Sequence, residues 1–411
     1  MQVLLAQLGA RRHYAVAEIL TEADLLACLY TDAYGGKWPF SVLSRIPKII
    51  LPSAARALVE RHGRLPASKV RAFQWFGLMY ARRLAQTHED SDAMAVHIEF
   101  GRRFCQTVVN SGIDGNDVVY AYRSAALELF EVARKKGIVT VLDQTIVPKR
   151  FENEILQNES KKAPGWATTP SEAAIAAYCQ REEREWQLAD VILCGSEFVK
   201  DAIKDCGGPH ERCQVVPTGI RLPNVGGQAV PRLPHTPFRV LFVGEVGLRK
   251  GIRYLLKALE QFDRSLVECR VIGGLRVPPE ILQKATPPNV TCTGRIPRSE
   301  VSKHYEWADV LCLPSLCEGS AIVSYEALAH GLPVITTPNA GTLVRDGVEG
   351  IIVPAQNATA LADALHQMRS LTESEYVRFS TSARARADFG DLDAYGHRLI
   401  HTLTTSFSES T

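Results

Sequence analysis

Two glutamates, Glu318 and Glu326, stand eight residues apart in a stretch that is suited to bind a ligand. They belong to "CEGSAIVSYEALAHG", which follows the β-branched run "VLCLPS" (310–315), and the pattern predicts a strand and then a helix from near Ser320. Glu318 then falls in the loop at the carboxyl end of the strand, and Glu326 about two turns into the helix. A carboxylate buried there is costly unless it accepts hydrogen bonds. Vicinal hydroxyls, such as those of a ribose, would supply them, and an ion pair with a nearby Arg or Lys is the alternative.

A second motif, "VLFVGEVGLRKGIRYLLKAL" (240–259), is suited to an anion. Its strand ends at Gly244, and Gly251 precedes a helix whose first turn would face the same edge of the sheet. Backbone amides at a helix N-terminus attract phosphate, and the adjacent cations Arg249 and Lys250 would neutralise it. A basic turn that only contacts solvent is the alternative.

Three backbone amides next to Glu318, those of Gly319, Ser320 and Ala321, are expected to open toward the same place. They would hold an anion or a hydroxyl. The carboxylates and amides together fit a ligand of two sugars with a phosphate bridge between them.

Short β-branched runs alternate with helix-length segments in two series, over residues 2–195 and 239–354. Such alternation is typical of βαβ units in parallel sheets that are covered on both faces. Between the series lies "LPNVGGQAVPRLPHTP" (222–237), whose Pro and Gly content indicates a linker. We therefore predict two doubly wound α/β domains, residues 1–224 and 225–388, that face each other across a ligand-binding cleft.

The overall composition limits the protein's partners and location. The net charge of +2, from 47 basic and 45 acidic residues, argues against a nucleic-acid partner. Ten scattered cysteines without C-x-x-C pairs predict reduced thiols and no metal site in a cytoplasmic protein. The first residues resemble a strand rather than a signal peptide, and no run approaches the roughly 20 apolar residues of a spanning helix.

Two segments lie outside the simple alternation. Residues 42–110 form a mainly helical insertion, in which 66–83 mixes Lys and Arg with large apolar residues. The segment 66–83 is either a basic amphipathic surface for the inner face of an anionic membrane or a core helix with a solvated basic edge. Residues 389–407 have a helical pattern, and a helix there is expected to cross back and complete the first domain.

The first domain offers its own candidates in "LGARRHYAVAEIL". Gly9 ends the first strand, and Arg11, Arg12 and His13 begin the first helix, so they would face the cleft and bind a diphosphate or an anionic acceptor. His13 is a candidate catalytic base, with a purely structural histidine as the alternative.

The combination of "EGSAIVSYE", "ALAHGLPVITTPNAGTLVRDGVEGIIVP", "VGEVGLRKG" and "LADVILCGSEFVKDAI" resembles the retaining glycosyltransferases of family 4. The resemblance covers residues 188–407 well and the first 187 weakly. It implies the GT-B fold, with two Rossmann-like domains. It further implies transfer of a sugar from a nucleotide diphosphate sugar to a hydroxyl of a sugar, lipid-linked or small-molecule acceptor, with retention of configuration. Such an enzyme would serve the synthesis of polysaccharides, glycolipids or other glycoconjugates.

The resemblance also implies roles for single residues. Glu318 would hold hydroxyls of the donor's sugar, and Glu326 the ribose of its nucleotide. Arg249 and Lys250 would bind the diphosphate and stabilise the charge that develops as it leaves. The remaining donor contacts are the amides of residues 319–322, which end at Ile322, together with Gly244 and Gly273 in the cleft and Gly294 and Arg295 near the nucleobase. No metal and no cofactor are expected.

Two positions depart from the family pattern. Glu245 stands where the family commonly has an arginine, so Arg249 is expected to supply the missing charge. The family often has a His-Asp or His-Glu pair at the end of a first-domain strand, and the matching place here, "VTVLDQT", has Leu142, Asp143 and Gln144. Asp143 would bind or polarise the acceptor hydroxyl, or only cap the next turn. A nucleotide-sugar epimerase of the same fold and a non-catalytic nucleotide-sugar-binding protein remain as alternatives.

Overall fold

The structure is a computed structural model that describes residues 1–43, 56, 58–222 and 233–410. The predicted domain boundary at 224/225 and most of the linker 222–237 lie outside these residues. So do residues 44–55 and 57 of the helical insertion expected at 42–110.

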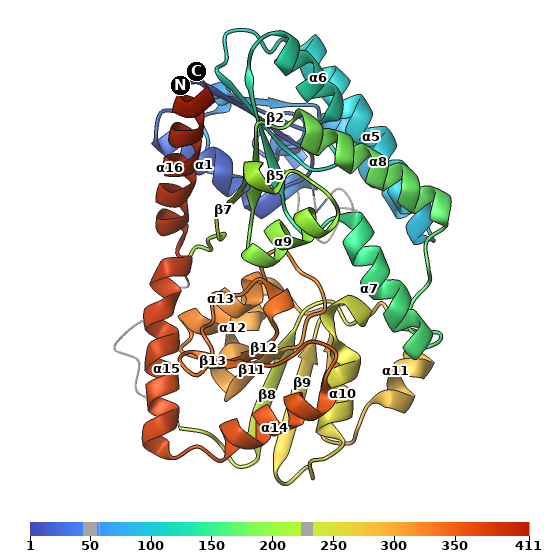
Figure 1. Ribbon diagram of the computed structural model, residues 1–411, viewed down its shortest axis with the longest axis vertical. Coiled ribbons are helices and arrows are strands. Elements are labelled where there is room, and N and C mark those ends of the chain that lie inside the picture. Colours follow the sequence, from blue (N-terminus) through green and yellow to red (C-terminus); the bar gives the residue numbers. More distant parts are fainter. Residues whose placement is uncertain (44–55, 57, 223–232, 411) are drawn as a thin grey trace.

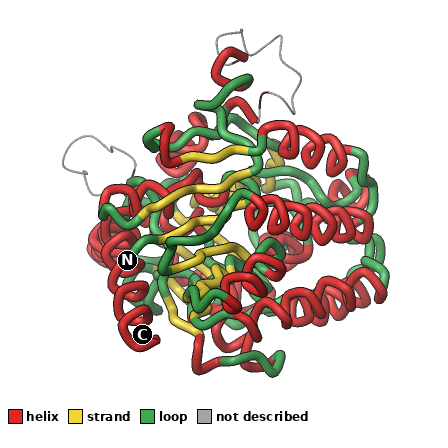
Figure 2. Tube along the Cα trace, turned by 90° about the horizontal axis from the view of Figure 1, so that it is seen from above, coloured by secondary structure: helices red, strands yellow, loops and turns green. Residues whose placement is uncertain are grey.

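The first sheet has seven parallel strands in the order β3-β2-β1-β4-β5-β6-β7. Their bounds are β1 Val3–Gln7, β2 Leu26–Thr31, β3 Val70–Ala72, β4 Val118–Tyr122, β5 Val139–Gln144, β6 Val191–Cys194 and β7 Cys213–Val215. Helices cover both faces (Figure 2): α1 Ala15–Glu22, α2 Phe40–Leu43, α4 Gln74–Ala85, α5 Asp90–Asn110, α6 Leu127–Lys135, α7 Lys149–Lys162, α8 Glu172–Leu188 and α9 Glu197–Asp205.

The second sheet has six parallel strands in the order β10-β9-β8-β11-β12-β13. Their bounds are β8 Phe238–Val243, β9 Val267–Ile272, β10 Val290–Gly294, β11 Val310–Leu313, β12 Val334–Thr336 and β13 Gly350–Ile352. The helices are α10 Ile252–Leu259, α11 Pro279–Ala285, α12 Arg298–Trp307, α13 Ile322–Ala329, α14 Ala358–Arg369, α15 Glu373–Ala387 and α16 Leu392–Ser410. The predicted doubly wound fold is confirmed for both sheets.

Alternate residues of each strand enter different cores, because side chains of a strand point to opposite faces of the sheet. In β1, Val3 and Leu5 join one core, and Leu4 and Ala6 join the other. Both faces are therefore buried, which explains why the strands have continuous apolar runs instead of alternating ones.

Two of the described helices contact both domains. Helix α7 runs from the first domain down to the second (Figure 1), where the buried Glu159 accepts hydrogen bonds of 2.9 and 2.8 Å from the Tyr254 hydroxyl. Helix α16 returns from the second domain to the first and packs on α1 through Tyr395, Leu399 and Leu403. No helix of the described ranges is long and apolar enough to cross a membrane.

The packing of α16 on α1 predicts a stability effect. Leu399 is fully buried, so Leu399→Ala removes apolar contacts and leaves a cavity, which should cost about 2–5 kcal/mol. Thermal unfolding followed by circular dichroism measures the loss. His401→Ala, on the exposed face of the same helix, is the control and should leave the melting temperature nearly unchanged. An equal, small effect of both changes would mean that α16 does not dock on the first domain in solution.

Candidate functional site

Glu318 lies in the loop after β11, as the sequence pattern predicts, and its carboxylate contacts two cations. Its Oε1 accepts a hydrogen bond of 2.8 Å from Arg249 Nη1 and lies 2.9 Å from Lys250 Nζ. The Glu318 side chain is buried, and its N–H donates to the Asn339 carbonyl at 2.9 Å. Two cations around one carboxylate leave a positive excess at the carboxyl ends of β8 and β11, which is suited to an anion.

Arg249 also faces the first domain. Its Nε lies 4.0 Å from Oε1 of Glu152 on α7, a residue that belongs to none of the sequence motifs. Burial lowers the pKa of Arg249, but the nearby Glu318 and Glu152 outweigh it and raise the pKa above its ordinary value. Arg249 therefore carries its charge at every physiological pH.

Gly244 and Gly273 end neighbouring strands and form a wall without side chains. Gly273 has a φ of +151°, and a Cβ on it would lie 1.7 Å from the Gly244 carbonyl oxygen. The Lys250 side chain passes over Gly244, and a Cβ on Gly244 would lie 3.4 Å from Lys250 Cε. Gly294 ends β10 farther along the same edge, and Arg295 is exposed beside it.

The loop that holds Glu318 is packed against the first domain. A Cβ on Gly319 would lie 1.9 Å from the Thr145 carbonyl oxygen after β5. The Ser196 hydroxyl donates to the Gly319 carbonyl at 2.7 Å, and the Thr218 hydroxyl donates to Ser320 Oγ at 3.0 Å. The loop is thus fixed by both domains.

One prediction about the amides of this loop is wrong. The Ala321 N–H donates to the Ala340 carbonyl at 3.1 Å, so it is not open to a ligand. The loop after β12 folds back over the entrance to α13, and this return is not visible in the local sequence. Helix α13 begins at Ile322 rather than near Ser320. The amides of Gly319 and Ser320 make no hydrogen bond to any part of the chain that the structure describes.

Glu326 is half-buried, not fully buried as predicted, and it has partners. The Tyr305 hydroxyl donates to Oε2 at 2.8 Å, and Arg298 Nη2 lies 3.5 Å from Oε1. The ion-pair alternative is therefore seen in the ligand-free chain. Sequence reasoning missed Arg298 and Tyr305, although their seven-residue spacing puts them on one face of α12, which begins at the carboxyl edge of the sheet.

Arg298 also reaches the first domain. Its Nη1 donates to His13 Nε2 at 2.7 Å, so the guanidinium links His13 to Glu326 across the cleft. Burial and the charge of Arg298 lower the pKa of His13, and the imidazole is neutral at pH 7. The nitrogen that would act as a base is occupied by Arg298 in this structure.

Asp143 is engaged inside the first domain, and this overturns its predicted role at the acceptor hydroxyl. It is 1% exposed and accepts hydrogen bonds from Arg12 at 3.0 and 3.2 Å and from the Tyr120 hydroxyl at 2.6 Å. Arg12 also donates to the Tyr395 hydroxyl of α16 at 2.6 Å. Arg12 is thus committed to Asp143 and is not the free anion-binding cation that we expected.

The turn after β1 has a strained backbone. Arg12, His13 and Tyr14 have φ values of 48°, 50° and 66°, which non-glycine residues rarely adopt. Gly9, with φ +83°, donates its N–H to Asp32 Oδ1 at 2.7 Å. Arg11 is exposed and makes no ion pair with a described residue.

A cavity of about 690 Å³ lies between the two domains. Glu326 and Ile322 line it from the second domain, and the turn after β1 lines it from the first. Its charged lining residues are Arg12, Arg64, Arg221 and Arg298, with Glu18 and Glu326. Because Asp143 neutralises Arg12, three arginines face two glutamates and leave a small positive excess. A cavity of this charge between the carboxyl edges of two parallel sheets is suited to an extended anionic ligand.

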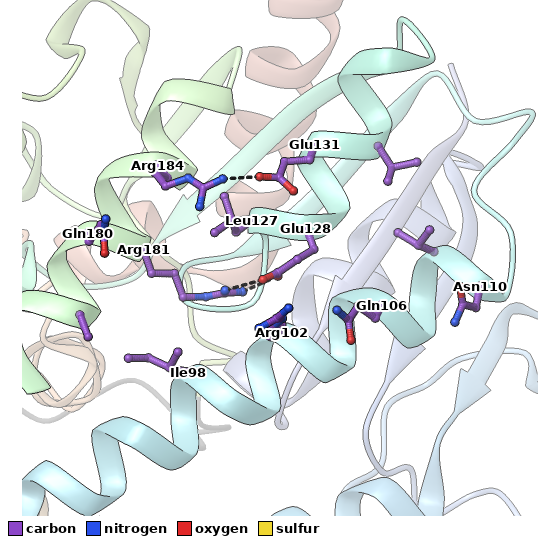
Figure 3. Close-up of a pocket in the computed structure, with 13 residues that line it drawn as sticks. Ile98, Arg102, Gln106, Asn110, Leu127, Glu128, Glu131, Gln180, Arg181 and Arg184 are labelled. Carbon is purple, nitrogen blue, oxygen red and sulfur yellow. Dashed lines mark hydrogen bonds and ion pairs between the residues drawn. The ribbon is translucent and has the colours of Figure 1, made fainter.

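A larger hollow, of about 900 Å³, lies on the outer face of the first domain between α5, α6 and α8 (Figure 3). Four of its five charged side chains form two pairs: Arg181 binds Glu128 with two bonds of 2.8 and 2.7 Å, and Arg184 binds Glu131. It contains none of the residues that the sequence selected, and we place the candidate site in the cleft.

Glu245, the departure from the family pattern, pairs with Arg276 Nε at 3.0 Å. The pair lies beside the glycine wall and offsets the charge of Glu245. Arg249 and Lys250 are therefore the cations that the second domain presents next to Glu318.

The buried pair of Arg12 and Asp143 predicts the effect of a mutation. Asp143→Asn leaves the Arg12 charge buried without its counterion, which should cost about 3–5 kcal/mol and lower the melting temperature. Asp114→Asn, which loses only an exposed pair with Lys136, is the control and should change stability by less than about 1 kcal/mol. If Asp143→Asn is as stable as the native chain, Asp143 is not held by Arg12 and is available for a ligand.

Comparison with known proteins supports the family resemblance for the second domain. Residues 237–370 match the model of the family "Glycosyl transferases group 1". A D-inositol 3-phosphate glycosyltransferase of Xylanimonas cellulosilytica is 29% identical over 246 residues, which are 54% of this chain and 57% of that protein. The matches to this and two further relatives span 57 to 63% of those proteins' lengths.

Solved structures extend the likeness to the whole chain. Anabaena Alr3699/HepE, solved in complex with UDP and glucose, has a TM-score of 0.61 at 15% identity, over 98% of this chain and 100% of that one. Sucrose-phosphate synthase from Thermosynechococcus elongatus has a TM-score of 0.66 at 17% identity, over 100% of both chains. The chain therefore has the two-domain GT-B fold, and its second domain matches the glycosyl transferases of group 1.

Proposed function

We propose that this protein transfers a sugar from a nucleotide diphosphate sugar to a hydroxyl acceptor, with retention at the anomeric carbon. The observation that carries the proposal is the contact of Glu318 with both Arg249 and Lys250 at the carboxyl ends of β8 and β11. A carboxylate that can bind sugar hydroxyls stands beside two cations that can bind a diphosphate.

The donor would span the cleft between Glu318 and Glu326. The free amides of Gly319 and Ser320 are close to the cations and can add hydrogen bonds to the phosphates. At the other end, ribose hydroxyls would donate to Glu326 and replace Arg298, while Tyr305 keeps the carboxylate oriented. The complex of HepE with UDP-glucose and the relatives' names support a donor of this class.

The cations would also serve the reaction step. As the sugar–phosphate bond breaks, negative charge grows on the diphosphate, and Arg249 and Lys250 stabilise it in a site that excludes water. They supply the charge for which other transferases use a metal ion, and we propose that this enzyme needs none.

Retention of configuration is proposed through attack from the same face that the diphosphate leaves. In this route the leaving diphosphate accepts the acceptor's proton, and the protein supplies position and charge. The engagement of Asp143 by Arg12 supports it, since this carboxylate is enclosed and not available as a base.

The acceptor is a sugar, a lipid-linked sugar or a small molecule, bound by the first domain. Relatives named for D-inositol 3-phosphate and for amylovoran biosynthesis support a role in forming glycosides or polysaccharides. The ten cysteines are free thiols in the structure, which supports a cytoplasmic location. The relatives' names favour transfer over the epimerase and the non-catalytic alternatives.

Donor binding tests the site directly. Calorimetric titration with UDP, GDP, ADP and their sugar conjugates should show selective binding of one nucleotide. Glu326→Ala should weaken it at least about tenfold, because two charge-assisted hydrogen bonds are lost. Glu306→Ala, an exposed carboxylate on α12, is the control and should bind like the native chain. Absence of binding by all three nucleotides would contradict the donor site.

One turnover assay tests both the stereochemistry of sugar transfer and the requirement for a metal ion. With the donor identified, the anomeric proton coupling of the product in an NMR spectrum should match that of the donor sugar. Turnover should persist in EDTA, because Arg249 and Lys250 provide the positive charge. An inverted product would refute same-face attack, and loss of turnover that added Mg²⁺ or Mn²⁺ restores would refute metal independence.

A further inference from the structure

Charge is distributed very unevenly along this nearly neutral chain. Residues 33–88 contain ten of the 47 Lys and Arg residues but only one of the 45 Asp and Glu residues, Glu60. This stretch therefore has a net charge of +9, and the rest of the chain has a net charge of −7. A local excess of this size attracts a polyanionic partner, although the whole protein would not.

The same stretch exposes large apolar side chains. Trp38 is 70% exposed, Trp75 64%, Val42 52% and Met79 48%. They are four of the nine large hydrophobic residues that are exposed in the described part of the chain. We call these four residues, with Arg82 and Arg83, the α2–α4 surface.

Helix α4 has one buried and one exposed face. Trp75, Met79, Arg82 and Arg83 are exposed, and their spacing of four, seven and eight residues puts them on one side. The opposite side packs inward through Phe76, whose ring lies 5.3 Å from that of Phe100. The helix is therefore neither a core helix nor an ordinary polar surface helix, and the exposed side combines two large apolar groups with two cations.

Helix α2 and the segment before it lie against α4, so the exposed groups form one surface. Gln74 binds Tyr34 N and O at 3.0 and 2.8 Å and the Lys37 carbonyl at 3.4 Å. Phe40 of α2 shares a small core with Leu78 and Ala81 of α4. The segment with Trp38 and Val42 is thereby fixed next to the helix with Trp75 and Met79.

No acidic residue in the described part of the chain neutralises the cations of the α2–α4 surface. Arg82 and Arg83 are exposed and make no ion pair with any described residue, and the nearest acidic residues along the chain are Glu60 and Glu89. A surface of free arginines beside exposed tryptophans is complementary to anionic head groups above an apolar layer, because tryptophan favours the interface of a bilayer.

We propose that the α2–α4 surface docks this protein on an anionic lipid bilayer. The tryptophans and Met79 enter the head-group region, and Arg82 and Arg83 bind lipid phosphates. The lipid contact needs no donor and no turnover, so it stands or falls separately from the glycosyl transfer proposed above.

Flotation of the full chain with vesicles, without nucleotide, tests the proposal. The chain should float with vesicles of 30% phosphatidylglycerol and 70% phosphatidylcholine, and at least about tenfold less with pure phosphatidylcholine. Trp75→Ala/Met79→Ala and, separately, Arg82→Glu/Arg83→Glu should each reduce the bound fraction at least about tenfold. Raised salt should release the protein, because exposed charges are screened.

Two control variants match these changes in chemistry and exposure. Leu275→Ala removes a 45% exposed apolar side chain of the second domain, and Lys284→Glu/Lys303→Glu makes the same change of charge on exposed lysines there. Both should float like the native chain. All variants should keep the native circular dichroism spectrum and melting temperature, which separates lost docking from lost folding.

Three results would overturn the proposal. The first is no flotation with anionic vesicles. The second is flotation that the lysine control reduces as much as Arg82→Glu/Arg83→Glu does, since net charge alone would then explain it. The third is a concentration-dependent dimer in light scattering that Trp75→Ala/Met79→Ala abolishes, because a second copy of the chain would then be the occupant of the surface.

Discussion

The contact of Gly319 with the Thr145 carbonyl fixes the geometry on which the rest of the cleft depends. A side chain at position 319 would lie 1.9 Å from that oxygen, so only glycine permits the two domains to come this close. The loop then carries Glu318 to Arg249 and Lys250, and the start of α13 to the turn after β1. This close backbone contact brings the chemistry of both domains together.

The charged groups around this point are paired in a way that a ligand can exchange. Glu318 holds Arg249 and Lys250, and Glu326 holds Arg298, while Arg298 also binds His13. The pair of Glu326 and Arg298 is only partly buried, so separating it costs less than separating the enclosed pair of Arg12 and Asp143. Glu318 and Lys250 are themselves buried, so a ligand that separates them must replace their contact. The cleft thus combines an exposed, exchangeable ion pair with enclosed ones.

The fold was accessible from the sequence because it depends on local patterns. β-branched runs such as "VLFV" and "VLCL" are buried on both faces, and the helix-length segments between them fit only parallel sheets. The position of Glu318 followed for the same reason, because a residue just after a parallel strand must lie at the carboxyl edge. Arg249 and Lys250 followed in the same way from the end of β8.

The partners of these residues were not accessible, because they come from distant parts of the chain. Asp143 meets Arg12 from 131 residues away, and Arg298 meets His13 from 285 residues away. The Ala321 amide is satisfied by the loop after β12, whose return path the sequence does not show. Local patterns therefore predict the backbone position of a residue, and tertiary contacts decide whether its side chain is available to a ligand.

The net charge of the whole chain hides how unevenly the charged residues are distributed. A value of +2 is correct for the chain and argues against a uniform field, but it conceals a segment of +9 beside a remainder of −7. The segment lies mainly in the helical insertion that departs from the doubly wound pattern, at the edge strand β3 of the first sheet. The inward side of the insertion packs in the core of the first domain through residues such as Phe100 and Phe104, and its outward side can vary without disturbing these contacts. This explains how one chain can combine a balanced two-domain frame with a strongly polarised outer surface.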